Sequence, residues 1–265
     1  MPNVRRTHRV ALLAPVVALA AASVLAGCGS SDDDAQAAQP AAGSLTAANF
    51  VDRVTAAQQK VESERMVVTA TSGGNDISVT TDLVRKGDGY DFAMTLKYPE
   101  MDGWDVRYLD STYYIDMGSL SSDKFLKYDP KDPGALGELG STFTSLGKQA
   151  DPTASVSAFQ GAVQSLDAQG GPDADGVQEY VLVADTSKVS GVIGDQIKQA
   201  GASASLPTTL TYHFWVDGED RVRKTTTDIG STTSTVEFSK IGEKVTVEKP
   251  SDDDLTTADK LGTAG

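Results

Sequence analysis

Short segments in which apolar and polar residues alternate recur along most of this chain, and they constrain its fold more than any other feature. The clearest runs from Tyr90 to Tyr98, with apolar side chains at the even positions and polar or small ones at the odd positions. Successive side chains of a strand point to opposite faces, so this period of two predicts a strand with one buried face. Turn residues such as Gly73-Gly74-Asn75 and Gly87-Asp88-Gly89 separate the segments, as expected for antiparallel strands.

Nine segments of this kind predict strands, five in the first half of the chain and four in the second. They lie at 66–71, 77–83, 90–98, 104–108, 113–117, 177–183, 210–216, 221–229 and 232–238. The first five follow one another closely and predict an antiparallel meander with one apolar face. Residues 245–247 are a candidate for an additional edge strand.

Four segments instead place apolar residues three or four positions apart, which predicts amphipathic helices. These run from Thr46 to about Ser63, from Asp132 to Leu146, from Asp151 to Leu166 and from Thr186 to Ile197. The second and third start with Asp-Pro, which is typical of an aspartate N-cap followed by proline in the first helical turn. Strands at both ends of the chain with helices between them predict an α+β fold, in which helices cover one face of a large sheet.

The N-terminus has the features of an export signal. Arg5, Arg6 and Arg9 precede an apolar run at 10–24, which is shorter than the roughly 20 residues of a membrane-spanning helix. The sequence Leu25-Ala26-Gly27-Cys28 that follows resembles the lipobox of bacterial lipoproteins. That resemblance implies cleavage after residue 27 and acylation of Cys28, whereas the alternative is a secreted protein with a free cysteine. Acyl chains on Cys28 would anchor the protein to the membrane.

These features divide the chain into four parts. Residues 1–27 are expected to be the signal peptide, and 28–43 the lipidated cysteine with a flexible tether that spans roughly 20 Å. Residues 44–248 are expected to form one domain, and 249–265 a disordered acidic tail. We therefore expect the domain to lie close to the outer face of the cell membrane.

Composition excludes several functions. The net charge is −14, and it becomes −17 without the three arginines of the signal, so the surface repels nucleic acid. Cys28 is the only cysteine, which excludes an intrachain disulfide. His213 is the only histidine after residue 27, so a zinc site of histidines and cysteines is excluded as well.

The patterns that could carry catalysis or metal binding have simpler explanations. No G-x-S-x-G nucleophile motif is present, and the stretch from Gly140 to Lys148 fits an amphipathic helix better than a phosphate-binding loop. Asp102 and Asp105 would point to opposite sides of a strand, which disfavours a glycosidase pair. Asp252–Asp254 is more typical of solvated charge than of a Ca²⁺ site. We expect no enzyme activity, no cofactor and no metal.

The overall layout resembles a known group of proteins. The chain has a lipobox, an acidic tether, an opening helix, a meander, inserted helices and a late hairpin from Tyr212 to Lys224 (YHFWVDGEDRVRK). In this layout it is similar to the LppX/LprG type of actinobacterial envelope lipoproteins. The resemblance covers roughly residues 44–248. It implies a curved half-barrel sheet, like that of the LolA/LolB carriers, whose concave face holds lipid tails under helices. It implies no catalytic residue.

Apolar residues on the predicted helices and strands allow two interpretations: an ordinary filled core, which periodicity alone favours, or the lining of a lipid-binding cavity. These residues are Phe92, Met94, Leu136, Leu139, Phe143, Phe159, Val163, Ile193, Ile197 and Phe214. The basic residues Arg221, Arg223 and Lys224 either dock a headgroup or balance nearby acids; the second is favoured.

The resulting hypothesis is a membrane-anchored lipoprotein that binds lipid acyl chains for transfer or insertion in the cell envelope. Its expected partners are a lipid or glycolipid, the membrane and an envelope transporter, with no nucleic acid. The glycine-bearing helix near Leu136, with Gly137, Gly140 and Gly147, is the candidate gate. The alternative is a sensor or scaffold without a cavity, which binds envelope proteins or cell-wall components through its outer surface.

Overall fold

The structure is a computed structural model that describes residues 44–72, 75–87, 89–99, 103–132, 136, 138–191, 193–195, 197–198, 207–229 and 232–258. All of them belong to one unit, Pro40–Gly265. The predicted signal peptide and the whole of the tether, with Cys28, lie outside the described residues. So do Asp102 and Gly137.

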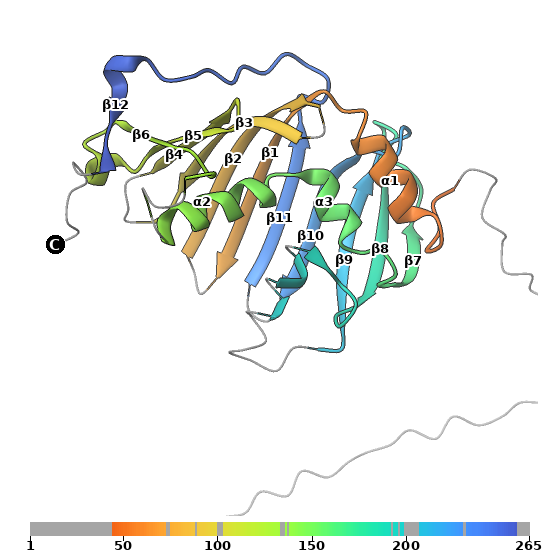
Figure 1. Cartoon of the computed structure of the whole chain (residues 1–265). Helices are drawn as coiled ribbons and strands as arrows, with labels where there is room; N and C mark the ends of the chain where they lie inside the picture. Colours follow the sequence, from red (N-terminus) through yellow and green to blue (C-terminus); the bar gives the residue numbers. More distant parts are fainter. Residues whose placement is uncertain are drawn as a thin grey trace, which may run out of the picture. The chain divides into compact units, whose positions relative to one another are not determined.

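The described residues form a sheet of twelve strands. Its strands are β1 (Ser63–Ser72), β2 (Asn75–Lys86), β3 (Gly89–Lys97), β4 (Trp104–Leu109), β5 (Thr112–Asp116), β6 (Phe125–Tyr128), β7 (Val163–Gln169), β8 (Gln178–Asp185), β9 (Thr209–Val216), β10 (Val222–Ile229), β11 (Thr232–Ser239) and β12 (Leu255–Thr256). The sheet is curved, and the helices make the fold α+β, which confirms the predicted fold class (Figure 1).

Two meanders build this sheet, which has the order β12-β6-β5-β4-β3-β2-β1-β11-β10-β9-β8-β7. Strands β1 to β6 form the first meander and β7 to β11 the second, and each pairs neighbours in sequence. Their junction is the antiparallel pair β1 and β11, in register from Arg65 opposite Ser239 to Ser72 opposite Thr232. Among the twelve described strands, only β12 pairs in parallel, with Leu255 opposite Phe125 on β6.

The helices lie across one face of the sheet because of this order. Strand β6 is next to one edge and β7 is the other edge, so the chain between them must cross the sheet. It does so through α2 (Glu138–Gln149) and α3 (Pro152–Ser157), as Figure 1 shows. Helix α1 (Phe50–Gln58) covers the same face near β8 and β9. Residues 191, 193–195 and 197–198 are also helical. The short 3-10 helices η1 (Gly118–Ser121) and η3 (Asp252–Asp254) lie in connections.

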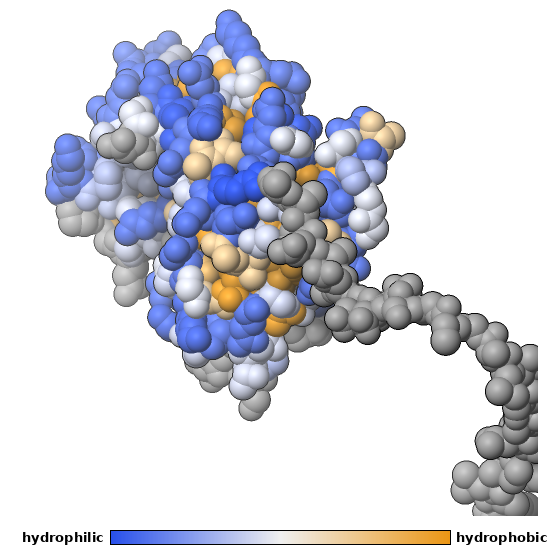
Figure 2. All heavy atoms as spheres, turned by 90° about the vertical axis from the view of Figure 1, so that its right-hand side faces the viewer, coloured by the Kyte–Doolittle hydropathy of each residue, from blue (hydrophilic) through white to orange (hydrophobic). Residues whose placement is uncertain are grey.

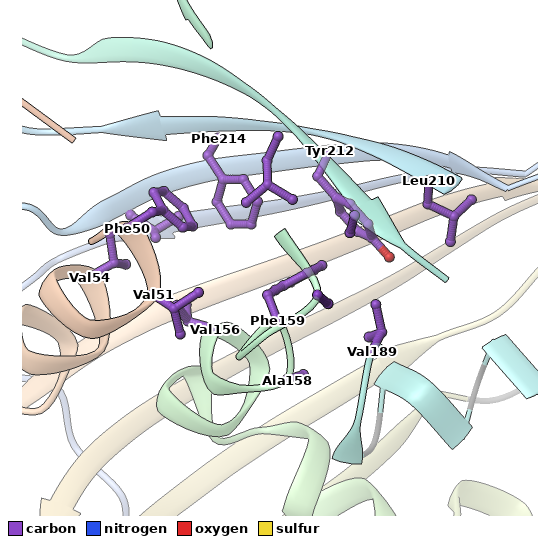
Figure 3. Packing of buried hydrophobic residues seen from close by; sticks show 14 of the residues in the cluster. Phe50, Val51, Val54, Val156, Ala158, Phe159, Val189, Leu210, Tyr212 and Phe214 are labelled. Atoms are coloured by element: carbon purple, nitrogen blue, oxygen red, sulfur yellow. The ribbon is translucent and has the colours of Figure 1, made fainter. Parts of the chain in front are cut away.

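Two clusters of buried side chains hold the helices on the sheet. In the first, α1 and α3 pack on β8 and β9, with Phe50 5.0 Å from Phe214 and Phe159 4.7 Å from Tyr212 between ring centroids (Figure 3). In the second, α2 packs on β3 to β6, with the Phe143 ring 5.9 Å from that of Trp104. Aromatic rings contact one another in both clusters, most of them in edge or tilted geometry.

The predicted helix from Asp151 to Leu166 is wrong in its second half. Asp151 is the N-cap as expected, accepting hydrogen bonds from the N–H groups of Thr153 and Ala154, but α3 ends at Ser157. A turn with Gly161 at a φ of +73° follows, and Val163 begins β7. A bulge between Val163 and Ser165 puts Val163 and Leu166 on the same face of β7, which reproduces helical spacing in a strand.

Other boundaries differ from the expectations. Strands β6, β7 and β12 were not predicted, and residues 245–247 are not a strand. The fourth helix begins at residue 191 rather than after Thr186, whose hydroxyl donates to the Pro207 carbonyl. The segment 249–258 was expected to be disordered, but it forms η3 and β12. Two contacts hold it: β12 pairs with β6, and the Lys124 ammonium donates to the Asp253 carbonyl.

Candidate functional site

An apolar cavity of about 330 Å³ lies between the helices and the centre of the sheet. Its walls come from the end of α1, from α2, α3 and the helical segment around residue 193, and from the strands β1, β2, β3, β9, β10 and β11. The apolar lining residues are Met66, Val68, Val79, Met94, Leu146, Ala150, Pro152, Val156, Phe159, Ile193, Ile197, Phe214, Val222, Ile229, Val236 and Phe238. Figure 2, viewed from the side of β7 and α1, shows apolar side chains at the surface between hydrophilic ones.

The cavity exists because the two core clusters fill the flanks of the sheet and leave its centre open. Strands β1, β10 and β11 lie between the clusters and point mostly short side chains at the helices, such as Val68, Thr225 and Val236. Short side chains reach less far toward the helices than the aromatic side chains of the two clusters do. An interior packed to ordinary density would contain few voids larger than a water molecule.

Five of the ten predicted site residues border this cavity. Met94 comes from β3, Phe159 follows α3, Ile193 and Ile197 lie in the fourth helical segment, and Phe214 comes from β9. Strand alternation and helical spacing thus placed them correctly on the covered face.

The other five do not border the cavity. Phe92 and Phe143 belong to the filled core, and Phe92 stacks on Tyr108 at 5.6 Å. Leu136 packs partly buried against the same cluster, while Leu139 is 39% exposed. Val163 lies on β7 and packs against the first cluster. Four of these five side chains therefore belong to the filled core, and Leu139 lies at the surface.

The central strands supply the cavity residues that sequence reasoning missed. Met66 and Val68 of β1 face Val236 and Phe238 of β11, about 170 positions away along the chain. Their alternation was visible in the sequence, but the pairing of β1 with β11 was not. Without that pairing, nothing indicates that these strands form the middle of the sheet.

The glycines of α2 have a packing role. A Cβ atom built on Gly140 would lie 2.6 Å from the Tyr128 ring, and one on Gly147 would overlap the Tyr113 hydroxyl. Both tyrosines are buried in the second cluster. Glycine therefore lets α2 approach the sheet closely at these two positions, in addition to lowering its helix propensity.

A buried polar pair adjoins the apolar wall. Glu64 on β1 and Gln58 at the end of α1 are both fully buried, and the Gln58 amide Nε2 donates to Glu64 Oε2 at 3.5 Å. Burial raises the pKa of the Glu64 carboxyl to about 7, against the effects of the Gln58 hydrogen bond and the Arg85 charge; Asp151 raises it further. The Arg85 guanidinium donates to the Tyr90 hydroxyl on β3. The Glu64 carboxyl therefore keeps its proton to a higher pH than an exposed glutamate does.

Tyr212 on β9 contributes a second buried polar group to the wall. Its ring borders the cavity and its side chain is 4% exposed. Burial raises the pKa of the hydroxyl to about 12, so the hydroxyl stays neutral at physiological pH. Figure 3 shows the ring beside Phe159, with the hydroxyl directed away from β9.

Several charged groups outside the cavity form ion pairs. Asp105 forms an ion pair with Arg107 at 3.0 Å. Arg221 and Arg223 both pair with Asp217, at 2.9 and 3.5 Å. The Lys224 ammonium lies 3.9 Å from the Glu237 carboxylate and 4.9 Å from the centre of the Trp215 ring. The basic patch thus balances nearby acids, which is the interpretation that the sequence favoured.

His213 also lies outside the cavity. Its Nδ1 is 2.8 Å from the Glu179 carboxylate, and its ring stacks on that of Trp215. Within the described part of the chain, no group of three or more histidine, cysteine or acidic residues could hold a metal ion. Nor do the described helices include one long and apolar enough to cross a membrane.

Comparisons with known proteins support the fold. No protein-family model and no curated protein matches the sequence. Among solved structures, LprF from Mycobacterium bovis matches with a TM-score of 0.52 at 16% identity, covering 77% of this chain and 96% of that one. The Mycobacterium tuberculosis lipoprotein LppX matches with a TM-score of 0.50 at 18% identity, covering 76% of this chain and 98% of the other. The chain therefore shares the fold of LprF and LppX, as the resemblance implied.

Proposed function

We propose that this protein is a lipoprotein of the cell envelope that binds lipid acyl chains in the cavity between its helices and the concave face of its sheet. The observation that carries the proposal is the apolar cavity of about 330 Å³, which lies at the low end of the roughly 300–1,000 Å³ typical of ligand pockets. The shared fold with the lipoprotein LppX supports it.

Physical chemistry explains why such a cavity is needed. Exposing two sixteen-carbon tails to water costs on the order of 24 kcal/mol at about 0.8 kcal/mol per CH₂. A lipid therefore leaves a membrane only when another apolar surface covers its tails. The apolar walls, from Met66 to Phe238, offer such a surface, and a lipid or glycolipid is the proposed ligand.

The proposed anchor keeps the domain beside its source of lipid. Acylation of Cys28 would hold the protein on the outer face of the cell membrane, and the tether of 28–43 would leave the domain free to reorient there. Helix α2 is the proposed gate, since it crosses the sheet between two connections and borders the cavity through Leu146. Transfer to an envelope transporter or insertion into a membrane would follow its opening.

Two substitutions on one strand test the proposal. Val68 on β1 borders the cavity, whereas its neighbour Val67 points to the other face and is opposite Thr80 and Glu237. We expect Val68→Phe to fill part of the cavity and to reduce uptake of a fluorescent acyl lipid from vesicles. Val67→Phe is the matched control, because it adds the same volume outside the cavity.

The uptake measurement uses the mature chain from residue 28 with Cys28→Ser, so that the protein's own acyl chains do not contribute. Uptake by the wild type and the Val67→Phe variant, with a loss in the Val68→Phe variant, would support the proposal. Equal uptake by all three would show that the lipid binds elsewhere. No uptake by the wild type would favour the scaffold alternative.

A further inference from the structure

Packed side chains border the cavity at both of its ends along the sheet. Towards β8 and β7, the border is formed by Phe159 and Tyr212, whose rings pack 4.7 Å apart in the first core cluster. Towards β4 and β5, it is formed by Met94, which is buried in the second cluster, and by Leu146, which packs against that cluster. Widening the cavity in either direction would pull these side chains out of a filled core.

Between these borders the cavity is elongated. Its lining comes from six strands that are neighbours in the sheet, in the order β3-β2-β1-β11-β10-β9. Neighbouring strands lie about 4.8 Å apart, so β3 and β9 are about 24 Å apart along the sheet, whereas a compact cavity of about 330 Å³ would be only about 9 Å wide. The cavity therefore runs across the strands, and its shape suits an extended chain.

The volume of the cavity limits how much of a lipid it can cover. One water molecule occupies about 30 Å³ in the liquid, and a CH₂ group has a similar size, so about 330 Å³ takes up about eleven such groups. Two sixteen-carbon tails would need about three times this volume. The space thus fits one chain of about a dozen carbons.

We propose that the cavity selects lipids with a single acyl chain, of which about ten to fourteen carbons are buried, over lipids with two chains. The second chain of a two-chain lipid would stay outside the cavity, and apolar surface left in water opposes transfer from a membrane. This inference rests on the proposed function, and it narrows the class of ligand to single-chain lipids.

A series of chain lengths tests the capacity of the cavity. Monoacyl phosphocholines of eight to eighteen carbons, kept below their micelle concentrations, compete with a fluorescent acyl lipid for the mature chain from residue 28 with Cys28→Ser. Their zwitterionic headgroup limits repulsion by the acidic protein. We expect the affinity to rise by up to about fourfold for each added CH₂ group, and to stop rising between about ten and fourteen carbons.

A direct competition tests the selection of one chain over two. The same protein is incubated with vesicles that contain dimyristoyl phosphocholine and its monoacyl counterpart in equal amounts, and native mass spectrometry gives the bound species. We expect one monoacyl lipid per protein chain and at least tenfold less of the diacyl lipid.

Two variants tie the chain-length limit to the cavity. Val68→Phe adds four carbon atoms to the wall, so the affinity should stop rising about four carbons earlier than in the wild type. Val67→Phe is the matched control, because Val67 does not border the cavity, and it should keep the wild-type limit.

The outcomes separate this inference from the proposed function. If the affinity rises steadily up to eighteen carbons, or if the diacyl lipid binds as well as the monoacyl lipid, the cavity holds more than one short chain; the inference is then wrong, while acyl binding stands. An unchanged limit in Val68→Phe would also overturn the inference, because the chain would then lie elsewhere. If the wild type binds none of these lipids, both the proposed function and this inference fail.

Discussion

The flanks of the sheet and its centre are packed differently, although the same helices cover both. On one flank, Phe143 of α2 is fully buried beside Trp104, in the cluster that also contains Tyr113 and Tyr128. At the centre, Val68 and Val236 are only partly buried and border an empty volume. Aromatic side chains span the gap between sheet and helices, and short ones do not. The flanks therefore stabilise the fold, while the centre is available for a ligand.

The largest expected effect separates these two regions directly. Phe143→Ala removes a fully buried ring from a filled core and should lower the free energy of unfolding by about 3–5 kcal/mol. Val68→Ala removes atoms that already face a cavity, so its loss should be only about 1 kcal/mol. Denaturant unfolding of both variants measures the difference. Similar losses at both positions would mean that the centre is packed as tightly as the flank.

Glu64 should make stability depend on pH. Its pKa rises from 4.5 in the unfolded chain to about 7 in the fold, so the folded state binds the proton more tightly. The free energy of unfolding should therefore fall as pH rises from 4.5 to 7, by on the order of 3 kcal/mol. Glu64→Gln has no proton to lose and should lack this component.

The measurement is the free energy of unfolding of the wild type and of Glu64→Gln across this pH window. In the difference between the two proteins, the contributions of all other acids cancel. We expect the variant to gain stability relative to the wild type as pH rises. Two parallel curves would show that the carboxyl group is not desolvated.

A smaller effect tests the close approach of α2 to the sheet. Gly147→Ala places a methyl group against the Tyr113 hydroxyl, and overpacking of this kind costs about 1–3 kcal/mol. Better helix propensity recovers up to about 1 kcal/mol, so a net loss of about 1 kcal/mol is expected. Ser145→Ala, at an exposed position of the same helix, should not destabilise the protein. A gain in stability from Gly147→Ala would show that α2 is loosely packed.

Local sequence patterns predicted a helix or strand well where a single periodicity or capping signal runs through the segment. Period-two alternation identified nine strands, and Asp151 was correctly predicted as an N-cap. The bulge in β7 gave Val163 and Leu166 a helical spacing, which local pattern reasoning cannot distinguish from a helix. Strands β6 and β12 are only four and two residues long, too short for an alternation to be seen.

The candidate site was harder to predict because it depends on topology. Helical and strand periodicity shows which side chains face inward, and Met94 and Phe214 were identified in this way. Whether an inward side chain meets a partner or a void depends on the strand order. Phe92 and Met94 are two residues apart on β3, yet only Met94 borders the cavity. That difference follows from the position of α2 above the sheet, which the sequence pattern does not encode.

Lipid binding is tested most directly by the mass of the protein as purified from a lipid-containing host. The mature chain from residue 28 with Cys28→Ser is analysed by native mass spectrometry, and solvent extraction then identifies any bound molecule. We expect close to one lipid per chain, lost in the Val68→Phe variant and kept in Val67→Phe. A wild-type protein that carries no lipid and takes up none when it is added would show that the cavity does not bind acyl chains.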